Sequence, residues 1–125
     1  MKGFKYAIAG TTLAIFLAVS PQAIPAQGQP ETIRGYVIDS ACAFTKGLSK
    51  PISPECAVAC AKAGSPLVIL TSAGVFYWPI SDAHPAEGQN ARLMEFAGKK
   101  VVVKGEVYER AGSRAIVIAS VEAAK

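Results

Sequence analysis

Five short β-prone segments, each followed by residues that favour turns, constrain the fold of this chain more than any other feature. The segments are 32–39, 66–71, 75–80, 100–109 and 114–121. Only Ser72-Ala73-Gly74 separates the second segment from the third, which predicts a β-hairpin. The fourth segment alternates between apolar and polar residues over much of its length, as in a strand with one buried face. The sequence therefore predicts a small protein built mainly of β-strands.

Two further segments carry helix signals. The predicted helices are 54–63 and 91–97. Ser53 and Asn90 are their predicted N-caps, and Gly64 and Gly98 are the residues expected to end them. The stretch 41–54 before the first helix is predicted to be irregular, because its glycine and prolines interrupt regular structure.

Strand, inserted helix, two strands, helix and two strands is the order of elements in an OB-fold, a small five-stranded Greek-key barrel. We predict such an OB-like barrel, with a cysteine-bearing helix between strands 1 and 2 and a short helix between strands 3 and 4. A different small β-barrel or a two-layer α+β sandwich is the alternative, because five short strands do not fix the connectivity. In an OB-fold the connection after the first strand flanks the binding face, so the cysteines are expected at the barrel mouth.

The N-terminus begins with Lys2 and Lys5 and continues with an apolar run at 6–19. A run of about 14 residues is shorter than the roughly 20 of a membrane span and is typical of a signal peptide. We predict cleavage after Ala26 and a soluble periplasmic or secreted protein without a membrane anchor. The predicted division is a signal peptide, a flexible leader and an OB-like domain, at 1–26, 27–30 and 31–125.

The charge balance of the predicted mature chain is modest. Without Lys2 and Lys5, eleven basic side chains stand against nine acidic ones, so the net charge falls from +4 to +2. Basic and acidic residues are interleaved, which favours a solvated surface and predicts no nucleic-acid partner. The sequence has no Gly-rich phosphate loop, histidine–glutamate zinc motif or nucleophile elbow, so we expect a binding module for an unknown protein or small ligand and no enzyme.

Three cysteines, Cys42, Cys56 and Cys60, lie within 19 residues. An odd number of thiols in an oxidising compartment leaves at least one outside any intramolecular disulfide. Cys56 and Cys60 are four residues apart on the predicted helix, which places their Cβ atoms about 5–6 Å apart. A disulfide needs about 3.5–4.5 Å between these atoms. We therefore predict one stabilising disulfide, from Cys42 to either Cys56 or Cys60.

Two alternatives remain open for the cysteines. In the first, all three stay reduced and bind copper as Cu(I) or zinc as Zn²⁺, for which thiolates are suitable ligands. Cys56 lies in the first helical turn, where the helix dipole stabilises a thiolate, and His84, the single histidine, is the candidate fourth ligand. In the second, the protein is a thiol-redox protein, although three residues separate Cys56 from Cys60 where the usual redox motif has two.

The third β-prone segment contains three consecutive aromatic residues, Phe76, Tyr77 and Trp78. Side chains alternate along a strand, so Phe76 and Trp78 are expected to share one face and Tyr77 to lie on the other. At least one of these faces is expected to pack in the core. Tyr77 and Trp78 are the candidates for a ligand surface, with Trp78 near the barrel rim.

Three motifs also show a resemblance to a known group. The motifs are 35–42 (Gly-Tyr-Val-Ile-Asp-Ser-Ala-Cys), 56–66 and 97–101, with Gly105 following the last of them. In these motifs the chain resembles a family of small exported bacterial OB-like proteins described as a domain of unknown function. The resemblance implies a fold and a compartment. Members often have a histidine shortly before the second cysteine, where this chain has Ser53-Pro54-Glu55.

Overall fold

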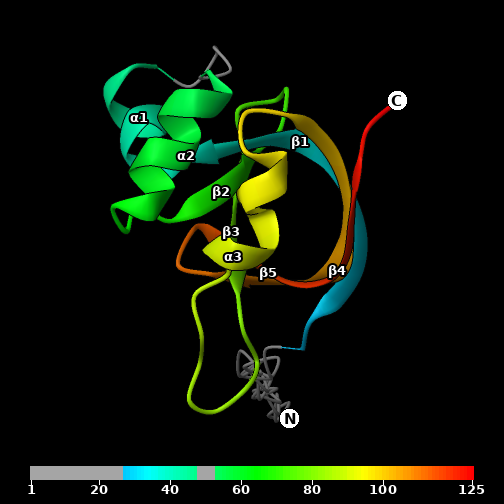
Figure 1. Cartoon of the computed structure of the whole chain (residues 1–125). Coiled ribbons are helices and arrows are strands. Elements are labelled where there is room, and N and C mark those ends of the chain that lie inside the picture. Colours follow the sequence, from blue (N-terminus) through cyan, green and yellow to red (C-terminus); the bar gives the residue numbers. More distant parts are fainter. Residues whose placement is uncertain (1–26, 48–52) are drawn as a thin grey trace, which may run out of the picture.

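A closed barrel of five strands forms the body of the protein (Figure 1), as seen in a computed structural model that describes residues 27–47 and 53–125. The strands are β1 (Gln29–Asp39), β2 (Leu67–Leu70), β3 (Phe76–Ile80), β4 (Lys100–Arg110) and β5 (Ser113–Ala123). Around the barrel they follow the order β1-β2-β3-β5-β4, and β4 closes the circle by pairing with β1. Only the β3–β5 pair is parallel. This is the strand order of an OB-fold, so the predicted fold class is confirmed.

The helices are short and lie between the strands. They are α1 (Ser40–Thr45), α2 (Pro54–Lys62), α3 (Asn90–Leu93) and a 3-10 turn, η1 (Met94–Phe96). The helix α2 has Ser53 as its N-cap and Pro54 in its first turn, as predicted. The helix α1 was not predicted: the irregular stretch expected at 41–54 was wrong for 41–45, where Asp39 caps a short helix, and residues 48–52 of that stretch lie outside the described residues. Within 27–47 and 53–125, the structure has no helix with the length and apolar character needed to cross a membrane.

The strand β1 begins earlier than the sequence predicted. Gln29 and Pro30, expected to belong to a flexible leader, pair with Val107 and Glu106 of β4. Their side chains are exposed, so no hydrophobic alternation marks them as strand residues. They are ordered because β4 is long enough, at 11 residues, to offer them backbone partners.

Two apolar clusters hold the elements together. The main cluster fills the barrel, and its largest members include Ile33, Val37, Leu67, Ile69, Tyr77, Leu93, Val101, Val103, Ile116 and Ile118. A smaller cluster of Ile38, Ala43, Val68 and Leu70 joins α1 to β1 and β2. Val37 and Ile38 are neighbours in β1 but belong to different clusters, because side chains alternate along a strand. The end of β1 is therefore buried on both of its faces, and the cysteine-bearing insertion starts from this rigid point.

Gly98 fixes the position at which α2 begins. Its φ of 76° lies in the left-handed region, and its N–H donates to the carbonyl oxygen of Val37 at 2.6 Å. A Cβ atom at Gly98 would lie 2.7 Å from Cα of Pro54, the first residue of α2. The absence of a side chain at Gly98 thus allows the start of α2 to lie directly against the backbone that follows η1.

Asn90 fixes the other end of α2. Its Oδ1 accepts from the backbone N–H of Leu67 at 2.8 Å, and its Nδ2 donates to the carbonyl oxygens of Ala61 at 3.2 Å and Ser65 at 2.9 Å. The prediction that Asn90 is an N-cap was wrong, because these tertiary bonds occupy its amide. The N-cap position of α3 is Gln89, which makes no side-chain capping bond.

We expect Asn90→Ala to lower the free energy of unfolding by about 1–3 kcal/mol, because a backbone donor and two carbonyl oxygens lose a partner. Urea denaturation followed by circular dichroism measures this change. The matched control is Gln89→Ala, since the Gln89 amide donates only to the nearby Glu87 carbonyl oxygen and should change stability by no more than about 0.5 kcal/mol. Equal effects of the two substitutions would contradict this assignment.

Candidate metal centre

The site begins at Asp39, the last residue of β1 and the N-cap of α1. The carboxylate oxygen Oδ2 accepts from the backbone N–H of Cys42 at 2.7 Å, which starts the helix. Asp39 is fully buried, with an exposed fraction of 0%. The cap therefore sets the direction of the first turn of α1, and with it the position of the Cys42 side chain.

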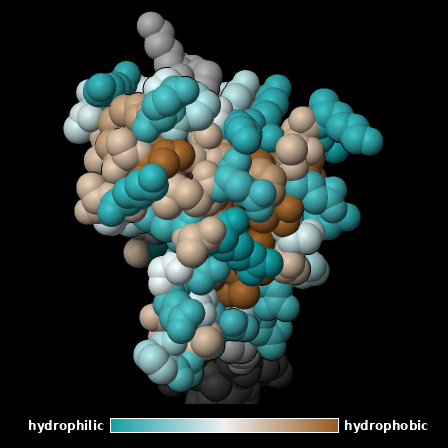
Figure 2. All heavy atoms as spheres, in the orientation of Figure 1, coloured by the Kyte–Doolittle hydropathy of each residue, from teal (hydrophilic) through white to brown (hydrophobic). Residues whose placement is uncertain are grey.

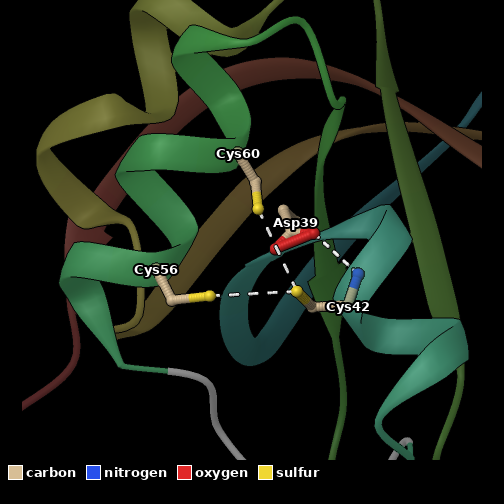
Figure 3. A group of neighbouring side chains, drawn as sticks. All are labelled: Asp39, Cys42, Cys56 and Cys60. Carbon is tan, nitrogen blue, oxygen red and sulfur yellow. Dashed lines mark hydrogen bonds between the residues drawn. The ribbon is translucent and has the colours of Figure 1, made fainter.

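The other two cysteines come from α2. The Ser53 hydroxyl accepts from the backbone N–H of Cys56 at 3.2 Å and so caps the helix one turn before the first of these thiols. Cys56 and Cys60 are four residues apart and lie on the same face of α2. Figure 3 shows both side chains pointing from α2 toward Cys42 and Asp39.

Cys42 lies between the other two thiols. Its Sγ atom is 3.8 Å from Sγ of Cys56 and 4.0 Å from Sγ of Cys60 (Figure 3). A disulfide has a sulfur–sulfur distance of about 2.05 Å, so all three cysteines are free thiols in this structure. The predicted disulfide from Cys42 is therefore not formed here, although the structure does place Cys42 next to both predicted partners.

Asp39 is the fourth member of the group. One ligand atom from each of Asp39, Cys42, Cys56 and Cys60 can be chosen so that all four lie within 4.8 Å of one another. The carboxylate oxygen Oδ1 of Asp39 is buried and has no hydrogen-bond partner in the part of the chain that the structure describes. An unpaired buried acceptor costs about 1–3 kcal/mol, and more when it carries charge. A cation bound by this oxygen would remove that cost.

The spacing of the sulfur atoms fits a single metal ion. In a tetrahedral site with Zn–S bonds of about 2.3 Å, neighbouring sulfurs lie about 3.8 Å apart. The two distances from Cys42, 3.8 and 4.0 Å, agree with this value. Three thiolates and one carboxylate also belong to the ligand types that zinc accepts in proteins. The four residues are thus suited in both geometry and chemistry to hold one ion.

Without a metal ion, the surroundings of Cys42 and Cys60 favour their protonated thiols. The adjacent Asp39 carboxylate, which attracts the thiol proton, together with burial raises the pKa of Cys42 to about 12. Burial raises the pKa of Cys60 as well, and the negative charge of Asp39 adds to that increase. A bound cation would reverse this balance, because ligation requires the thiolates and releases their protons.

The structure does not bring His84 to this group. His84 is exposed in the loop between β3 and α3, and the four clustered ligand residues do not include it. Figure 1 shows that this loop extends from the barrel away from α1 and α2. The fourth candidate ligand is instead Asp39, which the sequence did not identify as a ligand. The Asp-Ser-Ala-Cys spacing signals the cap, but it does not reveal that the second carboxylate oxygen is buried among thiols.

The predicted ligand surface is divided between two environments. Tyr77 belongs to the barrel core, with 7% of its surface exposed, whereas Phe76 and Trp78 share the outer face, as predicted. Their rings form a row with Phe44 of α1, with ring centroids 5.1 Å apart for Phe44 and Phe76 and 6.4 Å for Phe76 and Trp78. These three rings and Arg114 line an open groove. Trp78 thus lines this groove, and Tyr77 supports the barrel from within.

A comparison of this chain with protein-family models, curated proteins and solved structures finds no match.

In the reduced, metal-free protein, Cys42 should react slowly with iodoacetamide at pH 9, because a thiol with a pKa of about 12 is almost fully protonated there. Its rate should keep rising as the pH approaches 12. Asp39→Asn keeps an oxygen to cap α1 and removes the charge, so we expect a lower Cys42 pKa and alkylation about 10-fold faster at pH 9. Peptide mass spectrometry of quenched samples measures each cysteine separately.

The control for this experiment is Asp82→Asn, which removes an exposed carboxylate from the loop after β3. This substitution should leave the Cys42 rate unchanged. An Asp39→Asn protein with the same pH profile as the unmodified protein would show that Asp39 does not control this thiol.

Proposed function

We propose that the protein is an exported metal-binding protein that holds one Zn²⁺ ion with Cys42, Cys56, Cys60 and Asp39. The observation that carries the proposal is the convergence of three thiols and an unpartnered, buried carboxylate oxygen. Buried polar atoms normally have partners, and clustered thiols beside an unpartnered carboxylate match the donor set of a metal site. The donors come from two helices and a strand end that the barrel holds in place.

The fourth donor favours zinc over Cu(I). Three thiolates in a trigonal Cu(I) site with bonds of about 2.3 Å would lie about 4.0 Å apart, so the sulfur spacing alone suits either ion. A soft Cu(I) ion gains little from a carboxylate, whereas Zn²⁺ accepts carboxylate oxygen at about 2.0–2.2 Å as part of a tetrahedral set. The Oδ1 atom of Asp39 supplies such an oxygen, and its burial beside the thiols supports a tetrahedral ion.

The number of protein ligands favours a structural or carrier role for the ion. Catalytic zinc sites usually have three protein ligands and keep one position for water or substrate. Here four residues from the chain fill a tetrahedral set, so no position remains for a substrate. The ion would join α1 to α2 and both helices to the end of β1.

The exported location is part of the proposal. It rests on the basic residues Lys2 and Lys5, the apolar run that follows them and the small residue at the expected cleavage position. The motifs at 35–42 and 56–66 support assignment to the family of small exported bacterial OB-like proteins of unknown function.

The purified, reduced protein should bind one Zn²⁺ per chain. Replacement of zinc by Co²⁺ should give the intense visible and near-ultraviolet bands of a tetrahedral thiolate site. We expect Cys42→Ser, Cys56→Ser and Cys60→Ser each to weaken zinc binding by about 100-fold or more, and Asp39→Asn to weaken it by about 10-fold. Competition with a chromogenic chelator measures these affinities, which should rise with pH because binding displaces thiol protons.

The matched control for the ligand variants is His84→Ala, which removes the candidate ligand that the structure leaves exposed. It should bind zinc as tightly as the unmodified protein. The same titrations with Cu(I) decide between the two ions: tight Cu(I) binding that is insensitive to Asp39→Asn, together with weak zinc binding, would refute the assignment to zinc.

Zinc should stabilise the fold, and its removal should destabilise it. At a free zinc concentration 100 times the dissociation constant, binding to the folded state adds about 2.7 kcal/mol. For a domain of this size, we expect the melting temperature to rise by roughly 10–20 °C. Differential scanning calorimetry with zinc and with a chelator measures the shift, and Cys42→Ser should abolish it. An equal rise in melting temperature in Cys42→Ser would show that the stabilising zinc binds at another site.

A further inference from the structure

We propose that the site is also a redox switch, in which a disulfide between Cys42 and either Cys56 or Cys60 replaces the metal ion. This inference rests on the proposed function, because it names the condition under which the ion leaves. It starts from the central position of Cys42. Its Sγ is 3.8 and 4.0 Å from the two sulfurs of α2, so a single thiol is adjacent to both possible partners.

The geometry makes Cys42 a member of every intramolecular disulfide. Cys56 and Cys60 lie one turn apart on α2, where Cβ atoms are about 5–6 Å apart, and a disulfide needs about 3.5–4.5 Å. A bond between them would distort α2, whose two ends are fixed by contacts with Gly98 and Asn90. Cys42 belongs to a different helix and can approach either sulfur by turning its side chain. Two alternative disulfides are therefore accessible, and each leaves one thiol of α2 free.

Exposure determines where an oxidant attacks first. Cys56 and Cys60 are partly exposed, whereas Cys42 has only 8% of its surface accessible. A small-molecule disulfide thus reaches a sulfur of α2 before it reaches Cys42. Cys42, adjacent to both sulfurs and more deeply buried, is positioned to attack the mixed disulfide that results. An accessible thiol of α2 thus reacts with the reagent first. The more deeply buried Cys42 then displaces the reagent from the mixed disulfide, as in other two-step thiol–disulfide exchanges.

The oxidation balances with a small-molecule disulfide as the oxidant. A thiolate of α2 attacks one sulfur of the reagent, forming a mixed disulfide and releasing the first reagent thiolate. Cys42, which the bound ion would keep as a thiolate, then attacks the α2 sulfur of the mixed disulfide, and the second reagent thiolate leaves. Two cysteines have lost two electrons, and the reagent has gained them as two thiols. The zinc ion is released because two of its three sulfur ligands are now bonded to each other.

The product of this reaction cannot hold the ion in the same way. One thiol of α2 and the carboxylate of Asp39 remain, which is half of the original donor set. The disulfide still joins α1 to α2, as the ion did. The switch therefore exchanges one cross-link between these helices for another and releases the metal ion.

The test uses the full mature protein loaded with zinc and treated with one molar equivalent of dithiodipyridine, a small disulfide whose thiopyridone product absorbs light. We expect two thiopyridones, one released zinc ion and one intramolecular disulfide per chain. A chromogenic chelator reports the zinc, and peptide mapping by mass spectrometry identifies the bonded cysteines. The maps should contain Cys42 bonded to Cys56 or Cys60.

Three variants test the central role of Cys42 without zinc. Cys56→Ser and Cys60→Ser each retain one partner for Cys42, so each should form an intramolecular disulfide and release two thiopyridones. Cys42→Ser has the same number of cysteines, yet it should stop at a mixed disulfide and release one. Circular dichroism before oxidation confirms that the three variants are folded to the same extent.

The outcomes separate this inference from the zinc proposal. If the protein binds no zinc before oxidation, the proposed function fails and the metal switch fails with it. If zinc binds and stays bound after the Cys42 disulfide has formed, only the switch is overturned. A disulfide between Cys56 and Cys60, or intramolecular oxidation of Cys42→Ser equal to that of the other variants, would also overturn it.

Discussion

The buried carboxylate of Asp39 connects the barrel to the chemistry of the site. Its Oδ2 accepts from the backbone N–H of Cys42 and begins α1, while its Oδ1 faces the thiols without a hydrogen bond to any residue that the structure describes. A charge in such surroundings is unfavourable unless an opposite charge accompanies it. The same carboxylate keeps the thiol proton on Cys42 when no cation is present. A proton and a bound cation would thus compete for the same Cys42 sulfur.

The barrel gives this site a rigid base. Asp39 pairs with Leu67 in the register of β1 and β2, so the insertion that carries the cysteines leaves and re-enters the barrel at adjacent points. The N–H of Ser40 donates to the carbonyl oxygen of Pro66 at 2.9 Å and extends this contact by one residue. An insertion whose ends are already adjacent closes at a small additional cost in entropy. The scaffold can therefore hold two helices and a ligand cluster at one end of the barrel.

The sequence predicted most features that depend on local chemistry, although the short helix α1 with its Asp39 cap was missed. The helix α2 was predicted from its Ser53 cap and Pro54, and the alternation of β4 and of the aromatic residues in β3 matches the structure. Features that depend on tertiary partners were missed. The side chain of Asn90 looked like a cap because nothing in its neighbourhood in the sequence indicates that Leu67 and Ser65 lie beside it. The proximity of Asp39 to the three thiols was missed for the same reason, since it depends on the assembled fold.

The small side chains of α2 explain why a cross-link matters at this site. The residues of α2 buried against the barrel are Ala57 and Ala61, and Figure 2 shows mostly weakly hydrophobic and polar atoms over this part of the molecule. Alanine lets the helix approach closely, which brings Cys56 and Cys60 within reach of Cys42, but it buries little apolar surface.

The segment between β1 and β2 thus brings its cysteines close together, but it gains little free energy from the burial of apolar side chains. A metal ion or a disulfide would add to this attachment, because either one would link α1 and α2 directly. Most of the barrel core comes from strand residues, so a change in the state of the thiols would act on the attachment of α1 and α2 more than on the barrel itself.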